Sequence, residues 1–315
     1  MNRGNSIRQG PEVKTPPRIA VVIAAYESHA TIGRCLEALE GQTYQDFETV
    51  VVDSSPGEQT AEVVRTRFPD VNYWHSPARL FPHAARNDGV RRATARVLVF
   101  TDPDIYAHPN WLERMVRAHD ETGEAIVGAI DCVGRRWHDR GIHITKFSKW
   151  LPGGERREVD MGPTATLLVP RSDYDAAGGF SGALILGDVD FSTALRARGR
   201  ALLFEPRAVV EHHHTQSLTS FIHERWTRGV MYGELRAARR GSDRLGLLGW
   251  FLVTALPVRF VRNAILVFSQ CTRASRLGEL AATSPIVAAG YAASLGGEAL
   301  AYAQLLLSRR SRPRE

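Results

Sequence analysis

Cysteine is scarce in this sequence. Its three cysteines, Cys35, Cys132 and Cys271, are far apart, and none belongs to a CxxC pair. An odd and dispersed set excludes a disulfide framework, gives no signature of a zinc site, and is typical of a reduced, cytosolic protein. The polar N-terminus also lacks the apolar run of a secretory signal, so we expect a flexible lead-in over residues 1–17.

Lysine is also rare. It occurs only at Lys14, Lys146 and Lys149, so arginine carries nearly all of the positive charge, and the formal net charge is +6. Guanidinium groups suit phosphate oxygens and anionic lipid head groups. The sequence has no helix-turn-helix, zinc-finger or RNP-like signature, so we expect no nucleic-acid partner. The basic excess lies after residue 225, beside apolar segments, which favours contact with a membrane surface.

A GxGxxG loop after the first predicted strand is missing as well, which disfavours a dinucleotide-binding domain. The chain instead contains a regular alternation of short apolar runs and amphipathic segments. This alternation predicts an α/β fold with a mostly parallel, Rossmann-like sheet flanked by helices. We predict strands at 19–24, 47–52, 71–74, 97–100, 125–130, 164–169 and 201–204, and helices at 31–39, 60–68, 84–93, 111–122 and 188–198.

Two regions depart from this alternation. Residues 131–158 are polar, aromatic and basic, so we expect a loop or mobile insert near the site. The residues after 230 form basic and apolar helical segments. We therefore place an α/β domain at 18–230 and a helical, membrane-associated segment at 231–315, which a chain of 315 residues is long enough to accommodate.

Two carboxylates, Asp102 and Asp104, directly follow the predicted strand at 97–100. Ligands of open α/β sheets bind beyond the carboxyl ends of the strands. Mg²⁺ is typically held there by one or two carboxylates together with substrate phosphates. Pro103 stiffens the loop between the two aspartates. A solvated turn has the same composition. The choice between a metal site and a solvated turn therefore depends on the rest of the sequence.

Seven segments of the sequence form a family pattern. In order, they are Ala25–Glu27, Gln42–Glu48 leading into Val50–Asp53, Ala85–Gly89, Asp102–Asp104, Gly178–Phe180, Asp188–Asp190 and Pro206–His214. This pattern resembles the family 2 glycosyltransferases of the GT-A fold, over about residues 18–230. The resemblance implies transfer of a sugar from a nucleotide-diphosphate sugar, with inversion at the anomeric carbon and with Mg²⁺ or Mn²⁺ as cofactor.

The resemblance also implies a site for the nucleotide sugar. Asp53 resembles the family's acceptor for the nucleotide base, although an Asx-turn is the structural alternative. Arg228 would clamp the diphosphate, or would lie on a surface helix face. Arg86 would contact the nucleotide, or would be solvated. The implied donor site comprises Ala25, Tyr26, Glu27 (asparagine in many members), Asp53, Arg86, Asn87, Asp102 on the ribose side, and Arg228.

The metal ligands implied by the resemblance are Asp104 together with His212 or His214. Which of the two histidines is used stays open. A metal ion in this position would neutralise the charge that develops on the diphosphate leaving group.

The resemblance implies Asp188 as the general base, and Asp190 is the second choice. An inverting displacement needs a carboxylate that takes the proton from the attacking hydroxyl. Family members usually have Glu-Asp here, whereas this chain has Gly187-Asp188, which leaves the electrostatics on the acceptor side open. A helix N-cap is the structural alternative for Asp188.

Two apolar stretches occupy the C-terminal segment, at 245–268 and at 285–307. The first is interrupted by Pro257, Arg259 and Arg262, and the second is only weakly apolar. A spanning helix needs about 20 mainly apolar residues. We therefore expect helices that lie at, or dip into, the cytoplasmic face of the membrane. The alternatives are a helical lid over the sheet, and one or two spanning helices.

The leading functional hypothesis is an inverting, metal-dependent glycosyltransferase. Its apolar tail resembles that of membrane-associated bacterial members, which implies a lipid-linked or glycan acceptor used in cell-envelope polysaccharide biosynthesis. A nucleotidyltransferase is the first alternative, but it would need a glycine-rich phosphate loop. A non-catalytic GT-A-like membrane scaffold is the second, but it predicts loss of the aspartates. Neither the donor sugar nor its base follows from the sequence.

Overall fold

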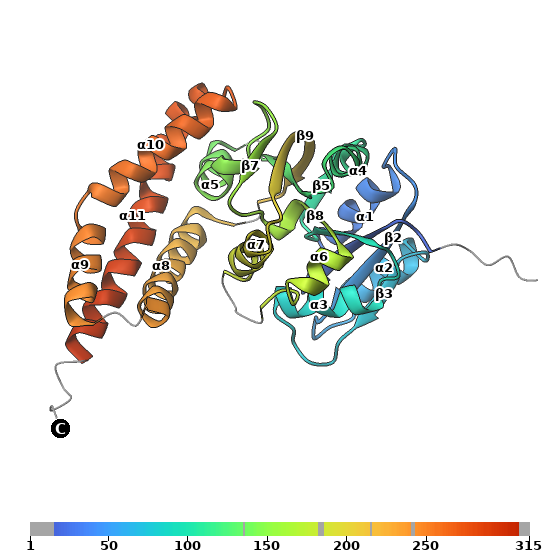
Figure 1. Cartoon of the computed structure of the whole chain (residues 1–315), viewed down its shortest axis with the longest axis horizontal. Coiled ribbons are helices and arrows are strands. Elements are labelled where there is room, and N and C mark those ends of the chain that lie inside the picture. The colour runs from blue at the N-terminus through green and yellow to red at the C-terminus, as the bar shows by residue number, and fades with distance from the viewer. Residues whose placement is uncertain (1–15, 135, 182–185, 215, 241–242, 309–315) are drawn as a thin grey trace, which may run out of the picture.

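The protein's structure is a computed structural model that describes residues 16–134, 136–181, 186–214, 216–240 and 243–308. An α/β part lies beside a group of C-terminal helices (Figure 1). Residues 1–15 of the predicted lead-in, and residues 309–315 of the predicted tail, lie outside the described residues.

A nine-stranded sheet forms the centre of the α/β part in the described residues, with the strand order β3-β2-β1-β4-β8-β6-β9-β5 and with β7 paired to β9. Strands β1 to β4 are parallel to one another, and β6 is parallel to β9. The strands are β1 (Ile19–Ala25), β2 (Phe47–Asp53), β3 (Asn72–His75), β4 (Val97–Thr101), β5 (Ile105–Ala107), β6 (Ala125–Cys132), β7 (Arg157–Val159), β8 (Leu167–Pro170) and β9 (Leu202–His212).

Strand β8 runs antiparallel between β4 and β6, so the sheet is mixed at its middle. The central strands β1, β4 and β8 are buried on both faces, as their continuous apolar runs predict. The predicted α/β class, with a mainly parallel sheet flanked by helices, is confirmed. The antiparallel direction of β8 and the short strand β5 were not predicted.

Helices cover the sheet at the positions that the amphipathic pattern predicts. In α1, for example, Ile32, Cys35, Leu36 and Leu39 form one buried face. The helices of the α/β part are α1 (Ile32–Glu40), α2 (Gln59–Arg67), α3 (Pro82–Arg92), α4 (Trp111–Thr122), α5 (Trp137–Phe147), α6 (Arg171–Ala176) and α7 (Gly187–Ala197), together with the 3-10 turns η1 (Ser148–Trp150) and η2 (Thr164–Thr166).

The predicted loop or mobile insert at 131–158 is wrong. This region contains the end of β6, helix α5, turn η1 and strand β7. Its polar composition was misleading because the polar side chains are buried with partners. Thr145, for example, is buried and donates a hydrogen bond to the Gly141 carbonyl at 2.8 Å. Helix α5 therefore belongs to the packed fold, and the C-terminal helix α11 (Leu277–Ser308) covers it.

The C-terminal helices form one packed group with the end of the α/β part. They are α8 (Leu218–Arg240), α9 (Arg244–Ala255), α10 (Val258–Arg273) and α11. Residue 230, where we placed a domain boundary, falls inside α8. Helices α8 and α11 approach closely at glycines: a Cβ on Gly229 would lie 2.0 Å from the carbonyl oxygen of Ser294. The second apolar stretch is thus largely used for packing within the protein.

Glu298 explains why that stretch is only weakly apolar. Its carboxylate is buried in α11, where it pairs with Arg236 of α8 and, at 2.7 Å, with Arg259 of α10, and it accepts a hydrogen bond from Tyr302 at 2.8 Å. A buried carboxylate needs such partners to offset its desolvation. The cluster ties three C-terminal helices together.

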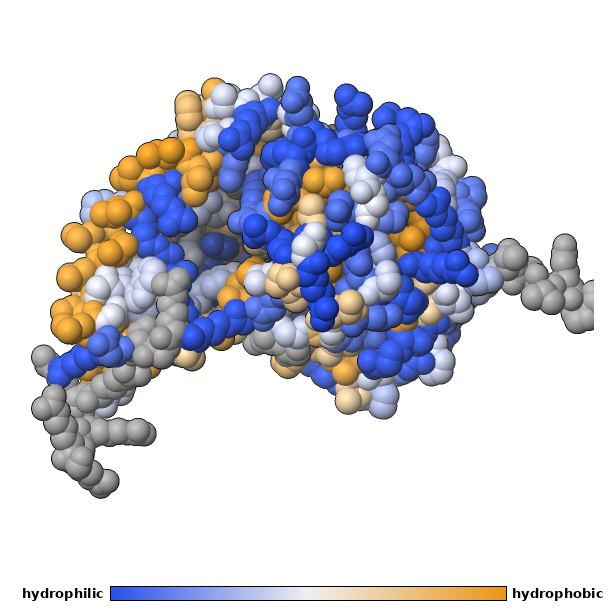
Figure 2. Space-filling model, viewed as in Figure 1, coloured by the Kyte–Doolittle hydropathy of each residue, from blue (hydrophilic) through white to orange (hydrophobic). Residues whose placement is uncertain are grey.

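An exposed apolar band follows α9 and α10 along the edge away from the α/β part (Figure 2). Among the described residues, no single helix has the length and hydropathy to cross a membrane; α9 and α10, bent by 55° at their junction, reach those limits only as a pair. The band is formed by Leu245, Leu248, Leu252, Val253, Leu256, Val258, Val261, Ile265, Leu266 and Phe268.

Candidate active site

Asp53 closes β2 at the carboxyl edge of the sheet and is fully buried. One carboxylate oxygen accepts a hydrogen bond from the Ser55 backbone N–H at 2.9 Å, which is an Asx-turn. The other accepts a hydrogen bond from the Tyr73 hydroxyl at 2.7 Å. The carboxylate is therefore occupied by its own chain, and its contact with a nucleotide base stays a prediction.

The end of β1 and the loop after it hold Ala25, Tyr26 and Glu27, the next residues predicted for the donor site. The Arg79 guanidinium lies 4.1 Å above the centre of the Tyr26 ring, so Tyr26 is already stacked on a cation. Ala25 uses its carbonyl to accept from the Ser54 backbone N–H at 3.1 Å. Glu27 has φ of 49°, the left-handed region that asparagine tolerates best. That conformation gives a physical reason for the asparagine of other family members at this position.

Arg86 lies on α3 and forms an ion pair with Asp102. Its side chain is only 4% exposed, which rules out the alternative of a solvated helix face. Arg86 also acts on Asp188, where its charge lowers the pKa. A single buried guanidinium therefore links the loop of Asp102, Pro103 and Asp104 (the DxD loop) to the predicted base.

Asp104 and His212 face each other across the β5–β9 edge. Nε2 of His212 lies 3.6 Å from Oδ2 of Asp104, and the His213 N–H donates to the Asp104 carbonyl at 2.9 Å. Burial, and next the nearby Asp102, raise the pKa of Asp104 to about 7. Burial lowers the pKa of His212 to about 4, so the ring is neutral.

These two residues fit a divalent metal ion. At 3.6 Å the His212–Asp104 contact is too long for a good hydrogen bond, and Nδ1 of His212 is buried with no partner among the described residues. Carboxylate oxygen and neutral imidazole nitrogen are ligands that Mn²⁺ accepts. His214 does not face Asp104. Its Nε2 lies 3.1 Å from Nδ1 of His143 instead.

Asp188 is the second residue of α7, whose N-cap is Leu186, and its carboxylate accepts a hydrogen bond from the Val189 N–H at 2.9 Å. Burial raises the pKa of Asp188, while Arg86 and Arg228 oppose that shift. Gly187 is required here because His83 occupies the space beside it: a Cβ on Gly187 would lie 2.3 Å from Cδ2 of His83. At the position where the family resembled by this sequence usually has glutamate, the space beside the backbone is thus filled by the His83 ring of α3.

Asp190, the second choice for the base, is bound to Arg239 of α8. Its two oxygens accept hydrogen bonds from the guanidinium at 2.7 and 2.8 Å, and the Ser181 hydroxyl donates to it at 3.1 Å. The Arg239 hydrogen bonds lower the pKa of Asp190. Because a strongly paired carboxylate of low pKa is a poor proton acceptor, the structure argues against Asp190 as the base.

Asn87 is also engaged within the protein. Its amide nitrogen donates to the Phe180 carbonyl at 2.9 Å, and its amide oxygen accepts from the Phe180 N–H at 3.1 Å and from the Tyr174 hydroxyl at 2.5 Å. These bonds hold the Gly178–Phe180 turn, in which both glycines have positive φ. Asn87 therefore positions this turn, and a contact with the nucleotide sugar stays a prediction.

Lys146 is the site residue that the sequence did not reveal. It lies on α5, is 17% exposed, and pairs at 2.8 Å with Glu224 of α8. Its charge lowers the pKa of both Asp104 and His212, so it lies close to the candidate metal ligands. Glu224 also pairs with Arg228 at 2.9 Å. The scarcity of lysine could have singled out Lys146, but the prediction of a loop at 131–158 gave this residue no defined position.

Comparisons with known proteins identify the family of this chain. A model of the family described as "Glycosyl transferase family 2" matches residues 20–180. Glycosyltransferase AglE of Haloferax volcanii is 26% identical over 254 residues, which cover 77% of this chain and 83% of AglE. The pre-mycofactocin glycosyltransferase of Mycobacterium tuberculosis is 26% identical over 288 residues, covering 84% of this chain and 59% of that protein.

A solved structure shares the fold. The mannosyltransferase PcManGT of Pyrobaculum calidifontis, determined with GDP-Man and Mn²⁺, superposes with a TM-score of 0.53 at 19% identity, over 88% of both chains. The family model spans more than half of this chain, from β1 to the Gly178–Phe180 turn, and includes the DxD loop. The chain therefore belongs to glycosyl transferase family 2 and is a glycosyltransferase of the GT-A fold.

Proposed function

We propose that this enzyme is an inverting, divalent-metal-dependent glycosyltransferase. It moves a sugar from a nucleotide-diphosphate donor to a lipid-linked or glycan acceptor at the cytoplasmic face of the membrane. The observation that carries the proposal is the position of Arg86, which pairs with Asp102 of the DxD loop and acts electrostatically on Asp188. Asp102, which is predicted to bind the sugar donor, and the predicted base Asp188 thus belong to one site, as a single displacement requires.

In the proposed reaction, Asp188 takes the proton from the acceptor hydroxyl. Burial raises its pKa, which makes the carboxylate a stronger base than an exposed aspartate. A divalent ion held by Asp104 and His212 would neutralise the charge that develops on the diphosphate. Lys146 and Arg228 place further positive charge beside the diphosphate, and Glu224 holds both of them. The structure of PcManGT with GDP-Man and Mn²⁺ supports a divalent ion that acts together with a nucleotide-sugar donor.

The membrane part of the proposal rests on the apolar band. Val258, Val261, Ile265 and Phe268 of α10 are each more than half exposed. Exposed apolar patches of this kind are typical of a surface that meets a partner or a membrane. Helices lying in the interface bury such a face among the lipid acyl chains while arginines contact the head groups. The enzyme and a membrane-embedded acceptor would then be held at the same surface.

The test is a transfer assay with the purified full-length chain in lipid vesicles. Vesicles that carry a polyprenyl phosphate are incubated with a panel of nucleotide sugars and Mn²⁺, and nucleoside diphosphate release and the anomeric configuration of the product are measured. We expect one donor to be used, with inverted configuration and loss of activity in chelator. A product with retained configuration, or turnover unaffected by chelator, would contradict the proposal.

A further inference from the structure

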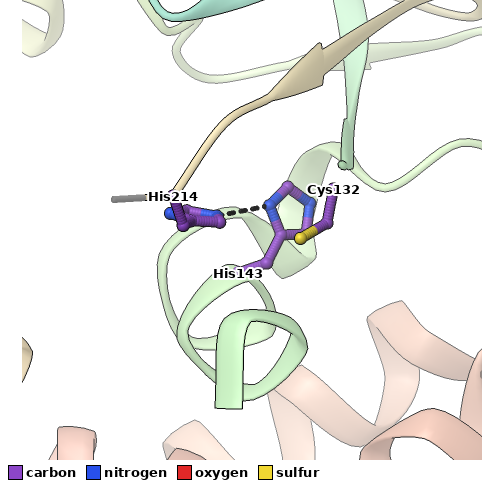
Figure 3. Close-up of side chains that lie close together, drawn as sticks. All are labelled: Cys132, His143 and His214. Atoms are coloured by element: carbon purple, nitrogen blue, oxygen red, sulfur yellow. Dashed lines mark hydrogen bonds between the residues drawn. The ribbon is translucent and has the colours of Figure 1, made fainter. Parts of the chain in front are cut away.

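A second cluster of metal-binding side chains lies beside the active site. Cys132 ends β6, His143 lies on α5, and His214 follows β9. Their ligand atoms all lie within 4.8 Å of one another. Figure 3 shows the three side chains meeting, with a nitrogen of His214 directed at a nitrogen of His143. No zinc signature is visible in the sequence because these residues come from three separate segments.

The hydrogen bonds of His143 define which of its nitrogens is free. Its Nε2 lies 3.0 Å from the carbonyl oxygen of Ile130. A carbonyl only accepts, so Nε2 carries the hydrogen, and the neutral ring presents a lone pair at Nδ1. A histidine that donates one N–H to a backbone carbonyl and directs its other nitrogen into a cluster has the arrangement of a metal ligand.

The spacing of the two rings fits a shared ion. Nδ1 of His143 lies 3.1 Å from Nε2 of His214. Two nitrogens bound to one tetrahedral zinc ion at about 2.0–2.1 Å are about 3.3 Å apart. The present distance is therefore close to that of a zinc-bound pair, and only small ring shifts are needed.

Cys132 supplies a different kind of ligand. Its sulfur accepts a hydrogen bond from the Gly134 N–H at 3.2 Å. Burial raises the pKa of this thiol to about 11, so the thiolate forms only when a metal ion binds. Thiolate and imidazole select Zn²⁺ or another soft transition metal, whereas Mg²⁺ and Mn²⁺ prefer oxygen. The chemistry of this cluster thus differs from that of Asp104 and His212.

We propose that Cys132, His143 and His214 bind a Zn²⁺ ion, with water in the fourth position. On binding, the thiol of Cys132 releases its proton to solvent, and His214 shifts its hydrogen to Nδ1, so the ion takes the place of the present hydrogen bond. The site joins β6, α5 and the end of β9. Because the His212 ring stacks on His214 with centroids 4.4 Å apart, the ion would also hold the ring that faces Asp104.

The test uses cobalt as a spectroscopic substitute in the full-length chain. After treatment with chelator, Co²⁺ is added, and we expect a thiolate-to-cobalt charge-transfer band with tetrahedral d–d bands that saturate at one ion per chain. Zn²⁺ should abolish these bands, and excess Mn²⁺ should not. Cys132→Ser should lose the charge-transfer band, and His143→Gln should bind Co²⁺ at least about tenfold more weakly. The matched control Cys271→Ser should keep the wild-type spectrum.

A second measurement does not depend on the folding of any variant. The wild-type protein is alkylated with and without Zn²⁺, and the modified cysteines are identified by peptide mass spectrometry. Zn²⁺ should protect Cys132, the one cysteine of the three that is not fully buried. Absence of a thiolate band in the wild type, an unchanged band in Cys132→Ser, or alkylation of Cys132 unaffected by Zn²⁺ would each overturn the proposal.

Discussion

Nε2 of His212, at the end of β9, lies 3.6 Å from Oδ2 of Asp104, in the turn after β4. The ring of His214 stacks on that of His212, but its Nε2 lies 3.1 Å from Nδ1 of His143. The family resemblance left open which histidine serves the catalytic metal. The structure gives the two histidines different partners. His212 faces the DxD loop, and His214 lies in the cluster that contains His143 and the Cys132 sulfur.

The first prediction tests this separation. We expect Asp104→Asn and His212→Gln each to lower kcat/KM by about 10²–10³ and to raise the Mn²⁺ concentration needed for half-maximal rate, because each removes a ligand or charge at the diphosphate. The rate is measured by nucleoside diphosphate release in a titration with Mn²⁺. His213→Gln is the control, since the His213 side chain packs on Tyr106 with centroids 5.8 Å apart. If His213→Gln lost as much activity as His212→Gln, the assignment would be wrong.

The second prediction concerns the base. Asp188→Asn should lower kcat by about 10²–10⁴, the contribution of a positioned base, while the Kd for the nucleotide stays unchanged. The wild-type rate should fall in acid as Asp188 becomes protonated, at a higher pH than for an ordinary aspartate, because burial raises its pKa. Asp190→Asn is the matched control and should keep most of the activity. Single-turnover rates and nucleotide titrations of both variants separate chemistry from binding.

The third prediction uses opposite pKa shifts in these two aspartates. Because the pKa of Asp188 is higher in the folded than in the unfolded state, protonation of this carboxyl favours folding. This stabilisation is complete below the pKa of the unfolded state and is lost as the pH rises through the pKa of the folded state. At neutral pH the wild type therefore contains a desolvated carboxylate that Asp188→Asn lacks. We expect this variant to have the higher Tm at neutral pH, with the difference shrinking towards about pH 4.

Asp190 should behave in the opposite way. Arg239 lowers its pKa, so its stabilisation is present above the unfolded pKa and is lost as pH falls through the folded pKa. Asp190→Asn should therefore lower the free energy of unfolding at neutral pH, by at most about 1 kcal/mol because Arg239 is 45% exposed. Melting curves across pH test both aspartates, and shifts of the same sign for both variants would contradict this account.

The fourth prediction concerns the contact between Gly187 and His83. Gly187→Ala should destabilise the protein by about 1–3 kcal/mol and lower kcat, because its Cβ would overlap the His83 ring and displace Asp188. His83→Ala in the same chain should relieve part of both effects. A double-mutant cycle on stability and kcat measures this coupling. Strictly additive effects would show that the two residues do not compete for the same space.

The fifth prediction tests the apolar band. Ile265→Glu, at a position that is 63% exposed on α10, should weaken binding to anionic vesicles while leaving Tm unchanged within error. Phe81→Glu provides the control, because it introduces the same charge at an exposed apolar position of the α/β part. Co-sedimentation with vesicles measures binding. Equal loss of binding in both variants would indicate a general charge effect instead of a docking face.

Much of the fold was predictable because the hydrophobic pattern of short sequence segments matches the burial of the same segments in the structure. The continuous apolar runs of β1, β2 and β4 became buried central strands, and the period of Ile32 to Leu39 became the buried face of α1. The prediction for residues 131–158 was wrong because this region does not follow its local pattern. His143 and Lys146 bond to His214 and Gln216, which are distant in sequence, so composition alone predicted a loop or mobile insert.

The sequence by itself determined the family, the carboxylates that follow β4, and the base candidate at the start of α7. Each of the short segments that form the family pattern is recognised from residues adjacent in the chain, and their order does not depend on the folded structure. The tertiary structure alone decided how these groups are used. It paired Asp190 with Arg239, placed Lys146 beside Asp104, and set His212 and His214 to face different partners. Cys132, His143 and His214 meet for the same reason: packing α5 between the sheet and the C-terminal helices brings together side chains whose spacing in the sequence carries no signal.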